Sequence, residues 1–182
     1  MRKPKQQLLA ITDIETSGLS PLRHEILEVG MLVVDSRTLE ILDSFEEKVA
    51  AESIESASQR ALEWNGYNPD EWSNAITLSQ CIEAYAQKTK GAMFCGHNVA
   101  FDWSFMIAAY EKTGVKMELD YHRLDIFSLA WAHFRDQDFG TITLDALAEH
   151  FGLESEIRPH RAMNGAMLAY KVLGRLLDAD LA

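Results

Sequence analysis

The stretch Leu8-Leu-Ala-Ile-Thr-Asp-Ile-Glu-Thr-Ser-Gly-Leu19 is the starting point for predicting the fold of this chain. It begins as an apolar strand, expected over Leu8 to Glu15, that presents two carboxylates, Asp13 and Glu15. Because side chains alternate along a strand, both lie on one face, about 7 Å apart. Carboxylates this close repel each other, and their oxygens favour magnesium or manganese over zinc. For an isolated pair, a solvated turn at the strand end is the more common explanation.

The turn that follows this strand adds a second feature. Backbone amides of Thr16-Ser-Gly-Leu19 could meet a phosphate or a terminal sugar, and Leu19 is placed to pack against a base. An ordinary strand-exit turn explains the same residues, so both interpretations stay open.

The remaining pattern predicts an α/β fold. Glu28 to Val34 and Leu39 to Val49 are expected to be strands joined by a turn around Asp35, which gives a meander with the first strand. After Ser58 the chain becomes helix-rich. Helices are expected over Gln59 to Trp64, Leu78 to Lys88, Phe101 to Lys112, Leu144 to Phe151 and about Arg161 to Leu177, with short strands over Ala92 to Cys95 and Arg123 to Ile126. We therefore expect one domain over residues 1–182, with a core over about 8–177 and helices on the faces of a sheet.

Composition limits the classes of function. The 182 residues carry 17 Lys and Arg against 28 Asp and Glu, a net charge of -11, so nucleic-acid affinity must be local rather than a general coating of phosphates. Carboxylates that hold divalent cations would reverse the charge that a phosphodiester meets. Cys81 and Cys95 lack metal-ligand spacing and fit reduced core residues, and no apolar run is long enough for a signal peptide or a membrane span. A cytoplasmic protein without a membrane partner fits best.

Polar residues also gather at a later junction between a strand and a helix. The segment Gly96-His-Asn-Val-Ala-Phe-Asp-Trp103 follows the apolar strand that ends at Cys95. Such junctions build sites in α/β sheets, because the helix N-terminus favours anions and the strand end opens into a crevice. Asp102 could steer a metal through water there. Alternatively, Asn98 bonds the turn and Asp102 only favours the first helical turn.

The third group of candidate residues is Arg158-Pro-His-Arg-Ala-Met-Asn-Gly-Ala166. His160 stands at the start of the last helix, and the unperturbed pKa of histidine near neutrality makes it a plausible general base. A lone histidine at a helix start is more often a surface or packing residue, so this interpretation needs support from the rest of the chain.

Taken in order, D-I-E-T-S-G-L, H-N-V-A-F-D and H-R-A-M-N-G-A resemble the DEDD exonucleases of the histidine subtype, the group that includes the proofreading epsilon subunit of bacterial DNA polymerase III. The segments His24 to Gly30, Leu124 to Ile126 and Thr143 to Leu147 are similar too, so the resemblance covers about Leu8 to Leu177. It implies a ribonuclease H-like mixed sheet with helices on both faces.

The resemblance also implies a site and a reaction. It implies that two divalent ions, Mg²⁺ or Mn²⁺, are held by Asp13, Glu15 and Asp102, with Asp13 bridging both ions and Asp102 acting through water. His160 would activate the attacking water. The terminal nucleotide would be bound by Thr16, Leu19, His97, Asn98 and Phe101. The implied activity is 3′–5′ exonuclease action on single-stranded DNA or RNA ends.

One position departs from the family pattern. The family has a fourth acidic residue five positions after the histidine, where this chain has Gly165, and Asn164 beside it points about 100° away on a helix. Loss of that acid, which in the family holds the same metal as Glu15, should weaken metal binding and misplace the water. Three explanations stay open: an introduced substitution, an acid from elsewhere such as Asp145 or Asp125, or a natural binder that has lost catalysis.

Two functions of different classes follow from these observations. The first is a metal-dependent exonuclease, which rests on Asp13, Glu15, Asp102 and His160 occurring together. The second is a catalytically weak or inactive module that binds nucleic acid or a protein partner, which rests on Gly165. The sequence leaves open DNA or RNA as substrate, and a homodimer or a polymerase as partner.

Overall fold

A computed structural model describes residues 7–156 and 158–178 of the chain. Five strands form one sheet in the order β3-β2-β1-β4-β5. Their bounds are Leu8–Thr16 (β1), Ile26–Asp35 (β2), Ile41–Lys48 (β3), Met93–Gly96 (β4) and Arg123–Asp125 (β5). The helices are α1 (Gln59–Asn65), α2 (Leu78–Lys88), α3 (Val99–Thr113), α4 (Ile126–Phe134), α5 (Leu144–His150) and α6 (Ala162–Leu176), with a short 3₁₀ turn at Ile54–Ser56.

The sheet is mixed, as the sequence predicted. β1, β2 and β3 are antiparallel neighbours and form the expected meander, whereas β4 runs parallel to β1 and β5 parallel to β4. The turn between β2 and β3 forms because the Asp35 carboxylate accepts hydrogen bonds from the backbone of Arg37 at 2.8 Å and Thr38 at 3.2 Å. The predicted α/β fold with a mixed sheet is confirmed.

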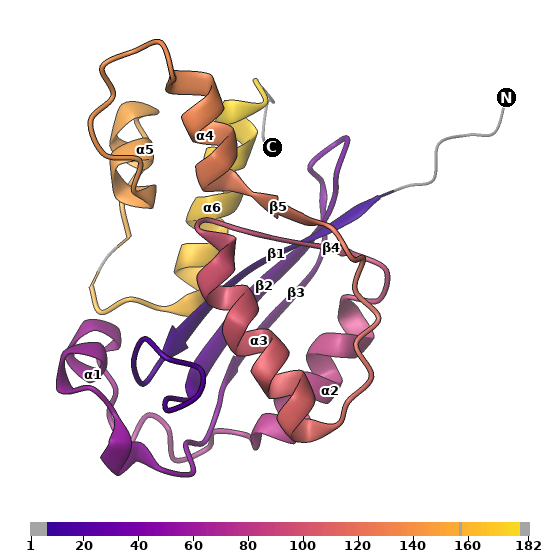
Figure 1. Cartoon of the computed structure of the whole chain (residues 1–182), viewed down its shortest axis with the longest axis vertical. Coiled ribbons are helices and arrows are strands. Elements are labelled where there is room, and N and C mark those ends of the chain that lie inside the picture. The colour runs from indigo at the N-terminus through magenta and orange to yellow at the C-terminus, as the bar shows by residue number, and fades with distance from the viewer. Residues whose placement is uncertain (1–6, 157, 179–182) are drawn as a thin grey trace, which may run out of the picture.

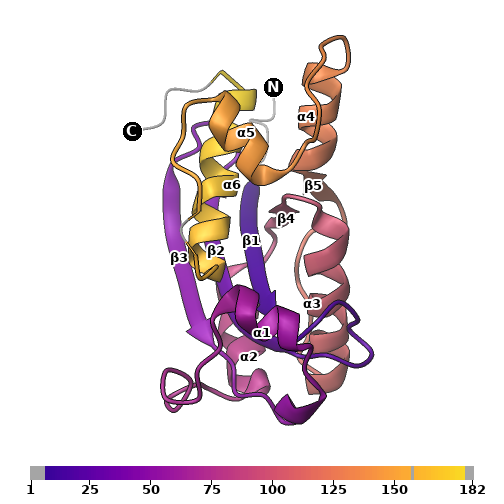
Figure 2. The same cartoon turned by 90° about the vertical axis from the view of Figure 1, so that its left-hand side faces the viewer.

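Helices cover both faces of this sheet (Figures 1 and 2). The alternation of β1 explains why: Ala10 and Ile14 pack in a core with α2 and α3, whereas Leu9 and Ile11 pack in a second core with α4, α5 and α6. Since β1 is central, it is apolar on both faces from Leu8 to Ile11, before Thr12 and Asp13. None of the helices within the described ranges is long and apolar enough to cross a membrane.

The start of α6 lies unusually close to β2. A Cβ on Gly30 would come within 2.2 Å of the Ala162 carbonyl carbon, so only glycine allows this approach. Gly30 is paired with Asp13 on the neighbouring strand. The beginning of α6, just after His160, is therefore held beside the first carboxylate of β1.

Candidate active site

The candidate site is a cleft at the carboxyl end of β1. β4 pairs with β1 only along Leu9, Ala10 and Ile11, so the rest of that edge of β1 is not covered by β4. α3 begins just beyond β4, and α1 lies across the end of β1 (Figure 1). Together with the start of α6 these elements enclose a cavity of about 550 Å³.

Residues from all three sequence motifs line this cleft. They are Asp13, Glu15, Thr16, Leu19, His97, Asn98, Phe101, Asp102 and His160. The structure thus brings together segments that are far apart in the sequence. Their catalytic and binding roles remain predictions.

Asp13 faces Gly165 across the base of the cleft. A Cβ added to Gly165 would lie 2.4 Å from Oδ2 of Asp13 and 2.7 Å from its Cγ. Asn164 is exposed on another side of α6, as the helical geometry predicted. Position 165 therefore points directly at the acidic site. With glycine at this position, the site lacks the carboxylate that the family has there.

Asp102 reaches β1 from the first turn of α3. Its Oδ1 accepts a hydrogen bond from the Ile14 backbone N–H at 3.2 Å, on the edge that β4 leaves uncovered. The side chain is buried, and burial raises the pKa of Asp102 to about 7, although the Ile14 hydrogen bond acts in the opposite direction. A structural role in binding β1 is thus added to its predicted role at the metal.

The two carboxylates of β1 are electrostatically unfavourable in the absence of cations. Burial, and then the charges of Asp102 and Glu15, raise the pKa of Asp13 well above its usual range. Burial, and then the charge of Glu156, raise the pKa of Glu15 to about 8. Within residues 7–156 and 158–178, no Lys or Arg forms an ion pair with Asp13, Glu15 or Asp102. The group of carboxylates therefore fits divalent cations, which would compensate these charges.

His160 is held by a glutamate that the sequence did not single out. Its Nδ1 lies 2.8 Å from Oε2 of Glu156, and Oε1 of Glu156 accepts the Arg161 backbone N–H at 2.9 Å. A carboxylate oxygen is an acceptor, so in a neutral ring this contact favours the tautomer with its hydrogen on Nδ1 and with Nε2 as the acceptor nitrogen. One ligand atom each of Glu15, Glu156 and His160 lie within 4.8 Å of one another.

An aromatic side chain fixes the plane of the His160 ring. Trp64 of α1 stacks on it, with ring centroids 4.6 Å apart and an interplanar angle of 11°. The His160 backbone N–H donates to the Trp64 carbonyl at 3.2 Å, and the Arg158 guanidinium lies over the Trp64 ring at 4.3 Å. Trp64 lines the cleft and is 44% exposed, whereas Trp72 is buried.

α1 is in turn fixed to the end of β1. The buried Asn65 donates its side-chain N–H to the Thr16 carbonyl at 3.1 Å, and Ser58 donates its backbone N–H to the Ser17 carbonyl at 2.8 Å. Trp64 and His160 are thereby tied to the strand that carries Asp13 and Glu15.

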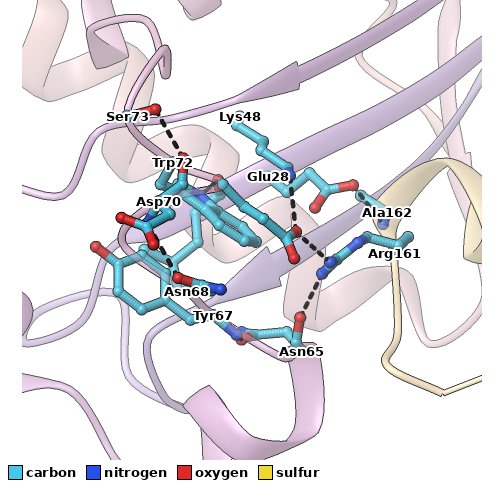
Figure 3. A network of polar contacts seen from close by, with 12 residues as sticks. Glu28, Lys48, Asn65, Tyr67, Asn68, Asp70, Trp72, Ser73, Arg161 and Ala162 are labelled. Atoms are coloured by element: carbon cyan, nitrogen blue, oxygen red, sulfur yellow. Dashed lines mark hydrogen bonds and ion pairs between the residues drawn. The ribbon is translucent and has the colours of Figure 1, made fainter.

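A polar network secures the first residues of α6 (Figure 3). Oε1 of the buried Glu28 accepts the Ala162 backbone N–H at 3.2 Å, and Arg161 donates to the Asn65 carbonyl at 2.5 Å and to Oε2 of Glu71 at 2.8 Å. Glu28 belongs to β2, so the network connects the sheet, α1 and α6. It determines where α6 begins and hence where Gly165 lies.

The second motif shapes the other wall of the cleft. Asn98 adopts the left-handed conformation, with φ of 60°, and its side chain does not cap α3, contrary to one of the alternatives raised by the sequence. Burial lowers the pKa of His97, which favours the neutral ring. Leu19, 84% exposed, stands at the rim.

The sequence raised Asp145 and Asp125 as acids that could replace the missing carboxylate, but neither is found next to Asp13. Asp125 accepts hydrogen bonds from the backbone of Val99 and from Ser128 at the start of α4. Asp145 lines the cleft from α5 but is not among the charges that raise the pKa of Asp13. The charge of Glu156 does raise the pKa of Asp13. Glu156 lies four residues before His160 in a segment without periodicity, so in the sequence only its acidity and its nearness to His160 could have indicated it.

Comparison with known families agrees with this geometry. The family described as "Exonuclease", which is the ribonuclease T group, matches residues 10–173. The chain belongs to the exonuclease family.

Relatives of this exonuclease domain occur within much larger proteins. The chain is 29% identical over 168 residues to a PolC-type DNA polymerase III of Caldanaerobacter subterraneus, which covers 92% of the chain and 11% of that protein. It is 26% identical over 177 residues to the PolC-type DNA polymerase III of Bacillus subtilis, covering 96% of the chain and 12% of that protein. The chain thus spans about a tenth of the length of these relatives.

Solved structures of exonucleases share the fold. The nuclease domain of 3′hExo, a DEDDh family member bound to rAMP, superposes with a TM-score of 0.78 at 20% identity, covering 97% of this chain and 94% of that one. Escherichia coli exonuclease I in complex with a dT13 oligonucleotide gives a TM-score of 0.78 at 16% identity, covering 95% of this chain and 43% of that one. At these identities the likeness concerns the fold.

Proposed function

We propose that this exonuclease domain is a metal-dependent 3′–5′ exonuclease that releases nucleotides from single-stranded DNA or RNA ends. The observation that carries the proposal is the convergence of Asp13, Glu15, Asp102 and His160, from three separate motifs, in one cleft. Family membership over residues 10–173 supports a nuclease, and the neighbours with rAMP and dT13 support a nucleotide in such a cleft.

Each side chain has a distinct part in the proposed reaction. Asp13, Glu15 and Asp102 would hold two Mg²⁺ or Mn²⁺ ions, which would supply stabilisation of the charge that develops on the phosphate and a lowered pKa of the attacking water. His160 would take the proton of that water at Nε2, since Glu156 keeps the hydrogen on Nδ1. Leu19, Phe101 and Trp64 line the cleft with apolar surface on which terminal bases can pack.

The test is hydrolysis of a 5′-labelled single strand in Mn²⁺. The wild type should shorten the strand in single-nucleotide steps from the 3′ end, and Asp13→Asn, which removes the proposed bridging carboxylate, should abolish the ladder. Ser44→Ala, an exposed change on β3, serves as the matched control. A ladder that persists in Asp13→Asn would locate the activity elsewhere.

A second candidate function rests on Gly165. If three carboxylates hold the ions too loosely, the domain binds nucleic acid or a partner such as a polymerase without turnover. Comparison of the wild type with Gly165→Asp separates the two: strong laddering by Gly165→Asp alone would support the binder, and strong laddering by both would show that Gly165 leaves the site competent.

A further inference from the structure

We propose that Glu156 supplies the fourth acidic ligand of the cation site, in place of the carboxylate that position 165 lacks. This inference rests on the proposed function, because it concerns a ligand of the same site. The acid would come from the segment that precedes α6 rather than from α6 itself. The site would then have four carboxylates, and not the three that Gly165 alone would leave.

The space at position 165 is already used by Asp13. The Asp13 carboxylate occupies the volume into which a Cβ of residue 165 would extend, 2.4 Å from Oδ2. An aspartate at position 165 requires the Asp13 side chain to rotate, whereas glycine allows Asp13 to lie directly against α6. A fourth carboxylate for this arrangement must therefore approach from another direction.

Glu156 approaches on the side of Glu15. Its side chain is only 7% exposed, and one of its oxygens belongs to the group with Glu15 and His160 whose ligand atoms lie within 4.8 Å. Two oxygens on opposite sides of an ion with metal–oxygen distances of about 2.1 Å are about 4.2 Å apart, so this spacing suits one Mg²⁺ or Mn²⁺.

Glu15 itself supplies an independent sign of a missing ligand. Glu15 is 9% exposed and lines the cleft, and within residues 7–156 and 158–178 its carboxylate has no hydrogen bond or ion pair with the protein. A carboxylate with so little access to water and no protein partner is costly to ionise unless a cation binds it. An ion between Glu15 and Glu156 would satisfy it.

The hydrogen bonds of Glu156 hold it in place without using up its oxygens. Oε2 contacts Nδ1 of His160 and Oε1 accepts the Arg161 N–H, at 2.8 and 2.9 Å. Each carboxylate oxygen has two lone-pair sites, so each keeps one for a metal. A purely orienting role toward His160 uses the same two contacts, and the experiment must separate the two roles.

Binding of Mn²⁺, measured by titration calorimetry without nucleic acid, makes this separation. Glu156→Gln should weaken binding of one Mn²⁺ by about tenfold or more, because it removes a charged ligand. Glu154→Gln, two residues away and exposed, is the matched control and should bind like the wild type. Unchanged Mn²⁺ affinity in Glu156→Gln, even with reduced hydrolysis, would leave only the orienting role and overturn the inference.

A second pair of variants guards against a merely structural effect of Glu156→Gln. Adding Gly165→Asp to Glu156→Gln should recover most of the Mn²⁺ affinity, since the Asp13 carboxylate can rotate aside, whereas adding the neutral Gly165→Asn should not. Equal affinity of the two double variants would show that charge is not what Glu156→Gln removed, and would overturn the inference. Absence of Mn²⁺ binding in the wild type would instead refute the proposed metal-dependent function itself.

Discussion

Glu15 shows at the scale of one residue how the cleft is prepared for a cation. It is buried beside Glu156, Glu28 and Asp102, and the Arg161 charge only partly offsets these neighbours. In the metal-free protein, holding the Glu15 proton is therefore more favourable than ionisation up to about pH 8. Metal binding must release that proton, so affinity for Mn²⁺ should rise with pH.

The stability of the metal-free protein should fall as pH rises. Folding raises the pKa of Glu15 from 4.5 to about 8. The contribution of protonated Glu15 to the free energy of unfolding is therefore fully present below about pH 4.5, and it is lost progressively as pH approaches 8. Glu15→Gln lacks this loss. In urea unfolding with EDTA, we compare the free energy of unfolding of Glu15→Gln with that of the wild type. The difference, variant minus wild type, should increase by up to about 1.4 kcal/mol per pH unit between pH 5 and 8. A constant difference would contradict the raised pKa.

His160 provides a second test at the residue scale. With Nδ1 bonded to Glu156 and the ring stacked on Trp64, His160→Gln should reduce the hydrolysis rate about 10²- to 10⁴-fold, because the proton acceptor is lost. Mn²⁺ affinity should change far less. His122→Gln, an exposed histidine outside the cleft, is the control and should retain full activity. A comparable loss in both variants would remove the special role of His160.

At the scale of elements, the site depends on how closely α6 approaches the sheet. Gly30 on β2 and Gly165 on α6 flank Asp13, and Glu28 accepts the N–H of Ala162 at the first residue of the helix. The helix N-terminus and the strand that carries the acids are thus placed by backbone contacts. A side chain at position 30 would meet the backbone of α6 and separate them.

Gly30→Ala should therefore destabilise the protein. The new Cβ would meet backbone atoms of Ala162 and Met163 at 2.2 and 2.3 Å, and backbone cannot rotate aside as a side chain can. We expect a loss of about 1–3 kcal/mol or more in the free energy of unfolding, measured with urea, and a weaker Mn²⁺ site. Wild-type stability would mean that α6 lies farther from β2.

The elements show what the sequence could predict and why. The continuous apolar runs of β1 and β2 reflect central strands that are buried on both faces, and the apolar positions of α2 and α3 pack against one of those faces. The order of motifs placed Asp13, Glu15 and Asp102 in one cleft. The segment that carries Glu156 lacks periodicity, and Trp64 lies in a short helix whose place depends on Asn65 and Arg161. Contacts of this kind are tertiary and leave no local pattern.

At the scale of the whole molecule, the net charge of -11 limits how nucleic acid is held. Arg60 lines the cleft and Arg158 lies over Trp64 near its wall, whereas acidic residues outnumber basic ones over the chain. Binding should therefore depend on cations in the cleft and on base packing more than on extended contacts to phosphates. We therefore expect short single-stranded ends to suit this surface better than long duplex.

Salt dependence of binding tests this expectation. With Mn²⁺ and the His160→Gln variant, which should bind without hydrolysis, the slope of log K against log salt for a labelled single strand should not exceed about 2 in magnitude, because each neutralised phosphate contributes only about 0.7. Fluorescence anisotropy between 50 and 200 mM salt gives this slope. A slope of about 4 or more would require a basic surface outside the cleft.

The most direct test of the proposed cation site is anomalous diffraction from crystals soaked in Mn²⁺. We predict a manganese peak in the cleft with oxygens of Asp13, Glu15 and Glu156 within about 2.3 Å, and a second ion on the Asp102 side of Asp13. An empty cleft would contradict the proposed site, and so would an ion that Asp13 and Glu15 bind while Glu156 remains only with His160 and Arg161.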